Sequence, residues 1–188
     1  MSYLKKIEYE IILKESFTVI RNCSGCGRKS YFKNTKRFRV NANGSKLDVW
    51  LIYQCEKCRH TLNLAIYERQ KASSVPGKEY QSFLSNDEEL AERYGRDLRL
   101  FAKNKAEIDF ERADHQYVKL SEALETDVYV GQAVITIRNP YGLKIRPEKQ
   151  IAEILKMPRS QVKKMIEEEK IRVEHTSLQV ISVWIDWG

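Results

Sequence analysis

The sequence predicts an α+β fold, with an antiparallel β region at the amino terminus, a helical middle and a small carboxyl-terminal α+β unit. Three patterns support this class. Residues 1–72 alternate between apolar and polar positions, as strands do. Residues 73–125 contain a stretch with apolar residues at helical spacing, and residues 126–188 contain two short helical stretches that lead into extended sequence. These three ranges are the predicted domains.

Composition limits the class of protein. The chain has 188 residues, of which 42% are hydrophobic and 31% charged, so it has enough apolar material for folded cores. No apolar run approaches the length of about 18 residues that a membrane-spanning helix needs. The start of the chain lacks the continuous apolar stretch of a signal peptide. We therefore expect a cytoplasmic protein with no membrane partner, in a compartment that keeps thiols reduced.

The positive charge is concentrated in one part of the chain. The net charge is +7 overall, but residues 1–70 alone carry 14 Lys and Arg against 6 Asp and Glu. Residues 71–140 carry 10 against 13 and are therefore slightly acidic. A basic segment of this kind indicates a polyanionic partner when it coincides with a specific motif.

All four cysteines fall in that basic segment, as two C-x-x-C pairs separated by 28 residues: Cys23, Cys26, Cys55 and Cys58. Two such pairs can supply four thiolates to one tetrahedral ion, and zinc is the ion that this ligand set prefers. Gly25 and Gly27 surround Cys26 and allow a sharp turn. A redox pair or a disulfide framework fits the pattern less well. We expect a structural Zn²⁺, because four thiolates leave no coordination position for substrate, and we expect His60 to be a surface histidine.

The sequence between the two pairs predicts two strands joined by a hairpin at Asn43-Gly44. In the second strand, alternate residues are expected to face the core: Leu47, Val49, Leu51 and Tyr53. Residues 61–68 predict a further strand with Leu62, Leu64 and Ile66 on one side. Short strands that carry C-x-x-C pairs at their ends are typical of a zinc ribbon.

The run "FRVNANGSKLDVWLIYQCEKCRHTLNLAIYER", together with "CSGC", resembles a bacterial family of conserved proteins known only as a domain of unknown function. The resemblance extends along most of the chain. It supports the zinc ribbon and implies no activity.

The middle of the chain begins with a Ser/Pro/Gly turn near residue 75 and then predicts a helix over residues 85–103, capped by Ser85 or Asn86. The positions expected to be buried in it are Leu90, Tyr94, Leu98 and Phe101. A second helical stretch is predicted over residues 114–125, and residues 127–139 predict a strand.

Residues 143–174 predict two short helices, one from Pro147 to about Lys156 and one starting at Arg159, followed by an extended segment. This stretch resembles the S-four RNA-binding fold. The resemblance implies that Arg146, Arg159, Lys163 and Lys164 contact RNA. The stretch departs from the family pattern at Pro158 and at Glu169-Lys170, where the family has a serine cap and a glycine-containing turn.

The favoured function is a non-catalytic, zinc-containing nucleic-acid-binding protein whose partner is structured RNA. Cations on two exposed surfaces would contact phosphate, and the candidates are Arg37, Arg39, Arg146, Lys149, Arg159, Lys163 and Lys164. Further candidates on the ribbon are Arg28, Lys29, Lys33 and Lys36, with Tyr31, Phe32 and Trp50 as possible surfaces for base stacking. A protein-interaction adaptor and a helix-turn-helix DNA-binding protein are the alternatives. The sequence contains no phosphate-binding loop or nucleophile motif, so we do not expect an enzyme.

Overall fold

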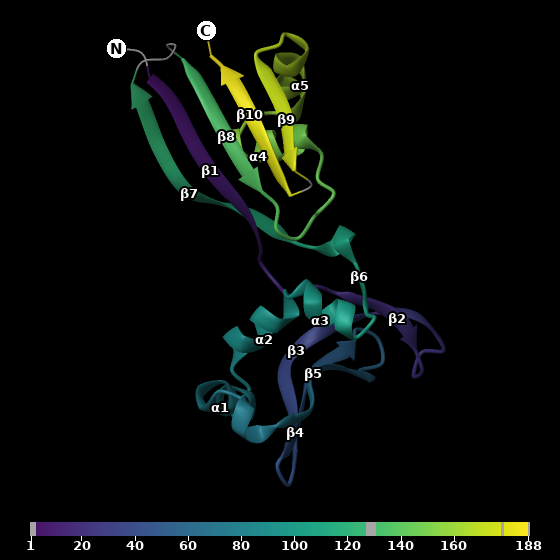
Figure 1. Ribbon diagram of the computed structural model, residues 1–188. Helices are drawn as coiled ribbons and strands as arrows, with labels where there is room; N and C mark the ends of the chain where they lie inside the picture. Colours follow the sequence, from purple (N-terminus) through teal and green to yellow (C-terminus); the bar gives the residue numbers. More distant parts are fainter. Residues whose placement is uncertain (1–2, 127–130, 178, 188) are drawn as a thin grey trace. The chain divides into compact units, whose positions relative to one another are not determined.

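The chain forms two compact units in the computed structural model (Figure 1), which describes residues 3–126, 131–177 and 179–187. Leu13–Asp114 form one unit, which we call the cysteine unit. Met1–Ile12 and His115–Gly188 form the other, which we call the terminal unit. Within the described residues there are two five-stranded sheets and five α-helices, so the predicted α+β class is confirmed.

The sheet of the cysteine unit has the strand order β5-β4-β3-β2-β6. Its strands are β2 (Val19–Cys23), β3 (Arg28–Asn43), β4 (Lys46–Cys55), β5 (Thr61–Lys71) and β6 (Glu107–Ile108). All pairings are antiparallel. The predicted hairpin joins β3 to β4, with Gly44 at a φ of 58°. β3 bulges between Asn34 and Arg37, where Lys36 also has a positive φ.

One face of this sheet holds the core of the unit. The alternation predicted for β4 is confirmed, because Leu47, Val49, Leu51 and Tyr53 are all fully buried. Three helices pack on this face: α1 (Gly77–Ser85), α2 (Glu88–Gly95) and α3 (Leu98–Lys103). Their aromatic side chains meet those of the strands edge to face, Phe83 against Phe38 at 4.9 Å and Phe101 against Tyr53 at 6.1 Å. Such pairs add to the stabilisation from apolar burial.

The single helix predicted over residues 85–103 is two helices. Asp87 caps α2 by accepting a hydrogen bond from the Leu90 N–H, and Asp97 caps α3 by accepting one from Arg99. Asn86, one of the two predicted caps, instead ends α1 in the left-handed conformation. Gly95, the last residue of α2, allows close packing, because a Cβ at this position would lie 2.1 Å from Ser16 Oγ. Helix α1 was not predicted from the sequence.

The sheet of the terminal unit has the order β7-β1-β8-β10-β9. Its strands are β1 (Tyr3–Leu13), β7 (His115–Thr126), β8 (Gln132–Arg138), β9 (Ile171–Ser177) and β10 (Val180–Asp186). β1 pairs with β8 in parallel, and β10 pairs with both β8 and β9 in antiparallel. The strand predicted over residues 127–139 is therefore confirmed as β8, whereas residues 127–130 lie outside the described residues.

Two predictions about organisation differ from this arrangement. The first strand does not join the cysteine-bearing sheet, as the range 1–72 implied, because it hydrogen-bonds to β8 instead. Residues 115–126 form strand β7, so the helix predicted there is wrong. The run "LSEALE" favours a helix locally, but pairing with β1 gives its backbone a different set of partners, and such tertiary contacts override propensity.

The two predicted carboxyl-terminal helices are confirmed as α4 (Pro147–Leu155) and α5 (Arg159–Glu167), followed by β9. Ile151 and Val162 are their most deeply buried apolar residues. Glu169, where the S-four pattern has a glycine-containing turn, has a φ of 59°. A relation to the S-four fold stays a prediction. Among the helices of the described residues, none has the length and apolar character that crossing a bilayer requires.

Candidate metal centre and nucleic-acid interface

The four cysteines converge at one end of the cysteine-unit sheet, as their spacing predicted. Cys23 ends β2 and Cys55 ends β4, while Cys26 and Cys58 lie in the turns that follow these strands. The four sulfur atoms all lie within 4.8 Å of one another. Two distances between the pairs are shorter, 3.3 Å between the Sγ atoms of Cys23 and Cys58 and 3.8 Å between those of Cys26 and Cys55. The group is compatible with one metal ion.

The two turns have the same backbone arrangement. We call residues 23–27 the first knuckle and residues 55–59 the second knuckle. In the first, the N–H of Gly27 donates to the carbonyl of Cys23 at 2.8 Å, and in the second the N–H of Arg59 donates to that of Cys55 at 3.1 Å. Gly27 and Arg59 both have a φ of 65°. The second knuckle therefore forms without the glycine that the first one has.

Gly25 has a packing role as well. A Cβ at this position would lie 2.8 Å from the sulfur of Cys58, which is closer than real Cβ atoms approach. The backbone of the first knuckle thus runs directly against a sulfur atom of the second. The corresponding position of the second knuckle is Lys57, which carries a full side chain.

Backbone N–H groups favour the charged form of Cys55. The N–H of Cys58, and next that of Lys57, lowers the pKa of the Cys55 thiol to about 6, although burial opposes this. Burial raises the pKa of Cys23 above its ordinary value, against the opposing effect of the N–H groups of Cys26 and Gly25. Since thiolates and not thiols bind metals, the amides of each knuckle support the chemistry that its first cysteine needs.

His60 lies outside the sulfur cluster. Its side chain is exposed, and its Nε2 lies 2.8 Å from Ser24 Oγ, so it connects the two knuckles by a hydrogen bond. The grouping of possible metal ligands consists of the four cysteines without it.

The helix-free face of the cysteine-unit sheet carries the two arginines predicted on the ribbon. Cross-strand partners point to the same side of a sheet, and Arg37 faces Ile52 while Arg39 faces Trp50. The guanidinium of Arg39 lies 5.9 Å from the centre of the Trp50 ring. Both arginines are exposed and Trp50 is partly exposed, whereas Phe38 and Leu51 point to the helical face.

Most of the other ribbon residues predicted to contact nucleic acid are buried or already have partners within the protein. Phe32 is 1% exposed and belongs to the core. Tyr31 has the Arg112 guanidinium 3.6 Å above its ring. The three ribbon lysines have carboxylate partners: Lys29 pairs with Glu107, Lys33 with Glu56, and Lys36 with Glu88 and Glu92. Among the described residues, Arg37 and Arg39 have no such ion pair.

The cations of the helix pair lie on exposed positions of the terminal unit. Three of them are ion-paired, Arg159 with Glu148 at 2.9 Å, Lys149 with Glu153 at 3.8 Å and Lys164 with Glu168 at 3.7 Å. The Arg159 guanidinium lowers the pKa of Glu148 by its hydrogen bond. Arg146 and Lys163 are exposed as well. These acids reduce the positive field that the helix pair presents.

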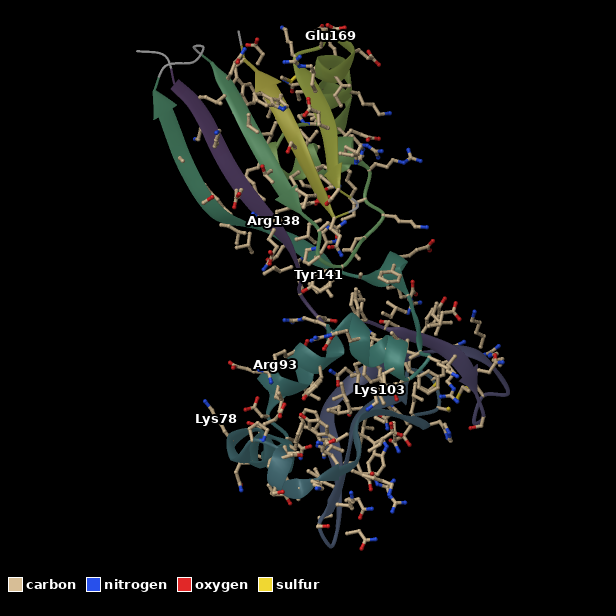
Figure 2. All side chains as sticks on the ribbon, viewed as in Figure 1. Lys78, Arg93, Lys103, Arg138, Tyr141 and Glu169 are labelled. Carbon is tan, nitrogen blue, oxygen red and sulfur yellow. The ribbon has the colours of Figure 1, made fainter. Side chains whose placement is uncertain are left out.

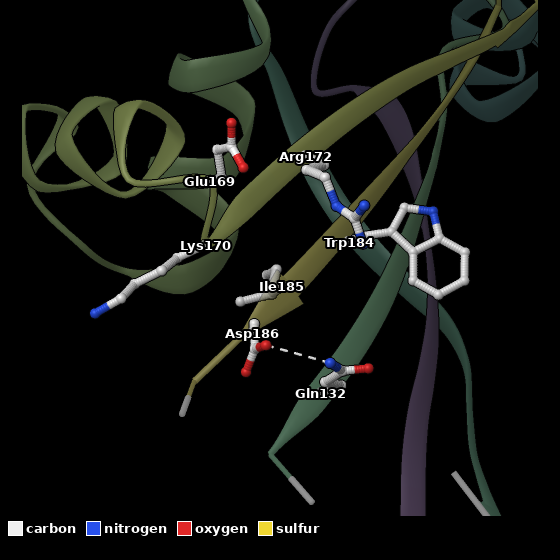
Figure 3. A pocket seen from close by; sticks show the side chains of 7 residues that line it. All are labelled: Gln132, Glu169, Lys170, Arg172, Trp184, Ile185 and Asp186. Carbon is white, nitrogen blue, oxygen red and sulfur yellow. Dashed lines mark hydrogen bonds between the residues drawn. The ribbon is translucent and has the colours of Figure 1, made fainter. Parts of the chain in front are cut away.

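A shallow hollow in the terminal unit (Figure 3), with a volume of about 100 Å³, was not predicted from the sequence. The residues that line it are Gln132, Glu169, Lys170, Arg172, Trp184, Ile185 and Asp186. The alternation of "VISVWID" could have indicated it, because it places Trp184 opposite in direction to the buried Val183 and Ile185.

Comparison with known proteins identifies the family. A family model described as protein of unknown function (DUF1062) matches residues 40–177, well over half of the chain. The chain belongs to the DUF1062 family. Cys55 and Cys58 lie within the residues matched to DUF1062, and Cys23 and Cys26 precede them. No curated protein and no solved structure matches the chain.

Proposed function

We propose that this protein is a non-catalytic, zinc-containing RNA-binding protein. Zinc is favoured because four cysteine sulfurs within 4.8 Å of one another fit a tetrahedral shell of soft ligands. Four thiolates fill that shell and leave no position for a reacting water or substrate, so the ion would be structural. Its role would be to hold the ends of β2 and β4 together and thereby fix the sheet whose open face binds RNA.

The observation that carries the RNA proposal is the helix-free face of the cysteine-unit sheet. It combines two exposed arginines on β3 with a partly exposed tryptophan and Ile52 on β4. Cations beside an aromatic ring suit unpaired nucleotides, because the ring stacks on a base while the cations contact phosphate. The expected partner is therefore an unpaired segment of a structured RNA.

Binding of a labelled 12-nucleotide single-stranded RNA, followed by fluorescence anisotropy, tests the proposal. If three to five cations contact phosphate, log affinity against log salt concentration should have a slope of about −2 to −4. The variant Arg37→Glu/Arg39→Glu should weaken binding at least tenfold.

A matched control is Lys78→Glu/Arg93→Glu, which makes the same change in charge on helices α1 and α2 of the same unit (Figure 2). It should bind RNA within a factor of about two or three of the unmodified protein. If both variants weaken RNA binding equally, the loss comes from the change in net charge and not from the helix-free face. Tighter binding to duplex DNA than to RNA would favour the helix-turn-helix alternative. Absence of nucleic-acid binding at low salt would favour the protein-interaction adaptor.

A further inference from the structure

An Arg–Trp pair occurs on both sheets. In the cysteine unit, Arg39 of β3 is the cross-strand partner of Trp50 of β4. In the terminal unit, Arg172 of β9 is the cross-strand partner of Trp184 of β10. Trp184, like Trp50, is partly exposed and alternates with fully or almost fully buried neighbours, here Val183 and Ile185. Each unit thus presents a guanidinium beside an indole on a sheet.

The second pair lies beside the hollow of the terminal unit. Figure 3 shows Trp184 and Arg172 on the side of the strands away from helix α5, with Gln132 and Asp186 at the strand ends nearby. The amide of Gln132 donates to the carboxylate of Asp186 at 3.2 Å. The hollow is therefore lined by an aromatic ring, a cation and a hydrogen-bonded polar pair.

The size of the hollow restricts what it can hold. Pockets that enclose whole small molecules have volumes of roughly 300–1,000 Å³. At about 100 Å³, this hollow can receive one flat group of a larger ligand and not a complete metabolite.

The charges around the hollow indicate how such a ligand would lie. Glu169 and Asp186 are acceptors that suit the amino groups of a base and repel phosphate. Arg172 is a donor that suits phosphate, whereas Lys170 is ion-paired with Glu168 at 3.7 Å. A group that is itself neutral but is attached to phosphates satisfies both sets.

We propose that the hollow beside Trp184 binds one unpaired base of the RNA, stacked on the indole, with Arg172 contacting the adjoining phosphate. This inference rests on the proposed function, and it adds a second RNA contact in the other unit. Each unit then has one RNA contact of the same kind, an indole beside a guanidinium.

Tryptophan fluorescence tests this directly, because the chain has three tryptophans, Trp50, Trp184 and Trp187. In the full-length variant Trp50→Phe/Trp187→Phe, Trp184 is the single emitter. A single-stranded oligoadenylate of 12 nucleotides should quench this emission as it binds, since stacking brings base and indole into contact. Anisotropy of the labelled RNA in the same samples reports binding at any site.

The combined readouts separate the two proposals. RNA that binds by anisotropy but leaves the Trp184 emission unchanged overturns the second contact and leaves the proposed function intact. Absence of RNA binding in the unmodified protein overturns both.

Substitution provides a second measurement. Trp184→Ala should weaken binding of the same RNA roughly 5- to 100-fold, which is the range for one stacked base, and Arg172→Ala should weaken it less. Lys144→Ala, which removes an exposed cation of the same unit away from the hollow, should have little effect. Circular dichroism would verify that each variant is folded. Folded Trp184→Ala with unchanged affinity would contradict the proposal.

Discussion

The two knuckles reach the same backbone shape with different residues. The first has the sequence CSGCG and the second CEKCR, yet the fifth residue of both has a φ of 65° and donates to the carbonyl of the first. An arginine in this conformation costs about 1–2 kcal/mol compared with glycine. The comparison indicates that contacts across the cluster, and not local preference alone, hold the second knuckle. The first knuckle, in contrast, needs Gly25 because Cys58 of its partner lies against it.

Removal of one ligand should have the largest effect. Cys23→Ser or Cys55→Ser takes one sulfur from the cluster, and each should abolish stoichiometric zinc binding, because a hydroxyl is a poor substitute for a thiolate. The two variants should be equally damaging, since both knuckles contribute two ligands. Metal analysis of purified protein and thermal unfolding with and without a strong chelator measure this. Stoichiometric zinc in either variant, or unmodified protein that unfolds identically in chelator, would contradict the four-sulfur site.

Gly25→Ala should have the next largest effect. The added Cβ would lie 2.8 Å from the Cys58 sulfur, so the two knuckles must separate and zinc affinity should fall about 10- to 100-fold, as for other changes beside a metal ligand. Lys57→Ala is the matched control at the corresponding position of the second knuckle, and it should leave the affinity unchanged. Competition with a chromophoric chelator gives both affinities. Equal affinities would show that the knuckles do not pack as described.

The smallest effects should come from the fifth positions. Gly27→Ala should lower the free energy of unfolding of the zinc-loaded protein by about 1 kcal/mol, because alanine is strained at this positive φ. Arg59→Gly should change stability in the opposite direction and by less, since glycine relieves the strain but loses more conformational freedom on folding. Urea unfolding of the three proteins measures both changes. The same sign for the two substitutions would indicate that Arg59 makes a compensating contact.

Local patterns predicted those parts of the fold that depend on nearby residues. The burial of β4, the hairpin at Gly44, the strand β8 and the helices α4 and α5 follow from alternation, turn residues and helix signals. The sulfur cluster followed from the spacing of four cysteines. The predictions of strands, turn and helices each use a pattern that fits within about a dozen residues. The cysteine prediction instead uses the preference of four thiolates for one tetrahedral ion.

The rest depends on pairing between distant residues. The alternation of β1 is the same whichever sheet it joins. Its pairing with β7 and its register with β8, from Leu4 with Gln132 to Glu10 with Arg138, place it in the terminal unit. β7 was predicted as a helix for the same reason, because its partner is more than 100 residues earlier in the chain. The hollow at Trp184 combines residues of β8, β9 and β10, so no short stretch of sequence contains it.

The parallel pairing of β1 with β8 has a consequence for synthesis on the ribosome. The cysteine unit is contiguous, so all of its strands and cysteines are synthesised before β8, and domains generally fold as units in the order of synthesis. β1, by contrast, emerges first and has to wait for more than 100 further residues before its partner exists. Folding of the cysteine unit brings its two ends together, because the Lys14 N–H donates to the carbonyl of Asp114 at 3.0 Å. The nascent chain then has a much smaller loop to close when β8 appears.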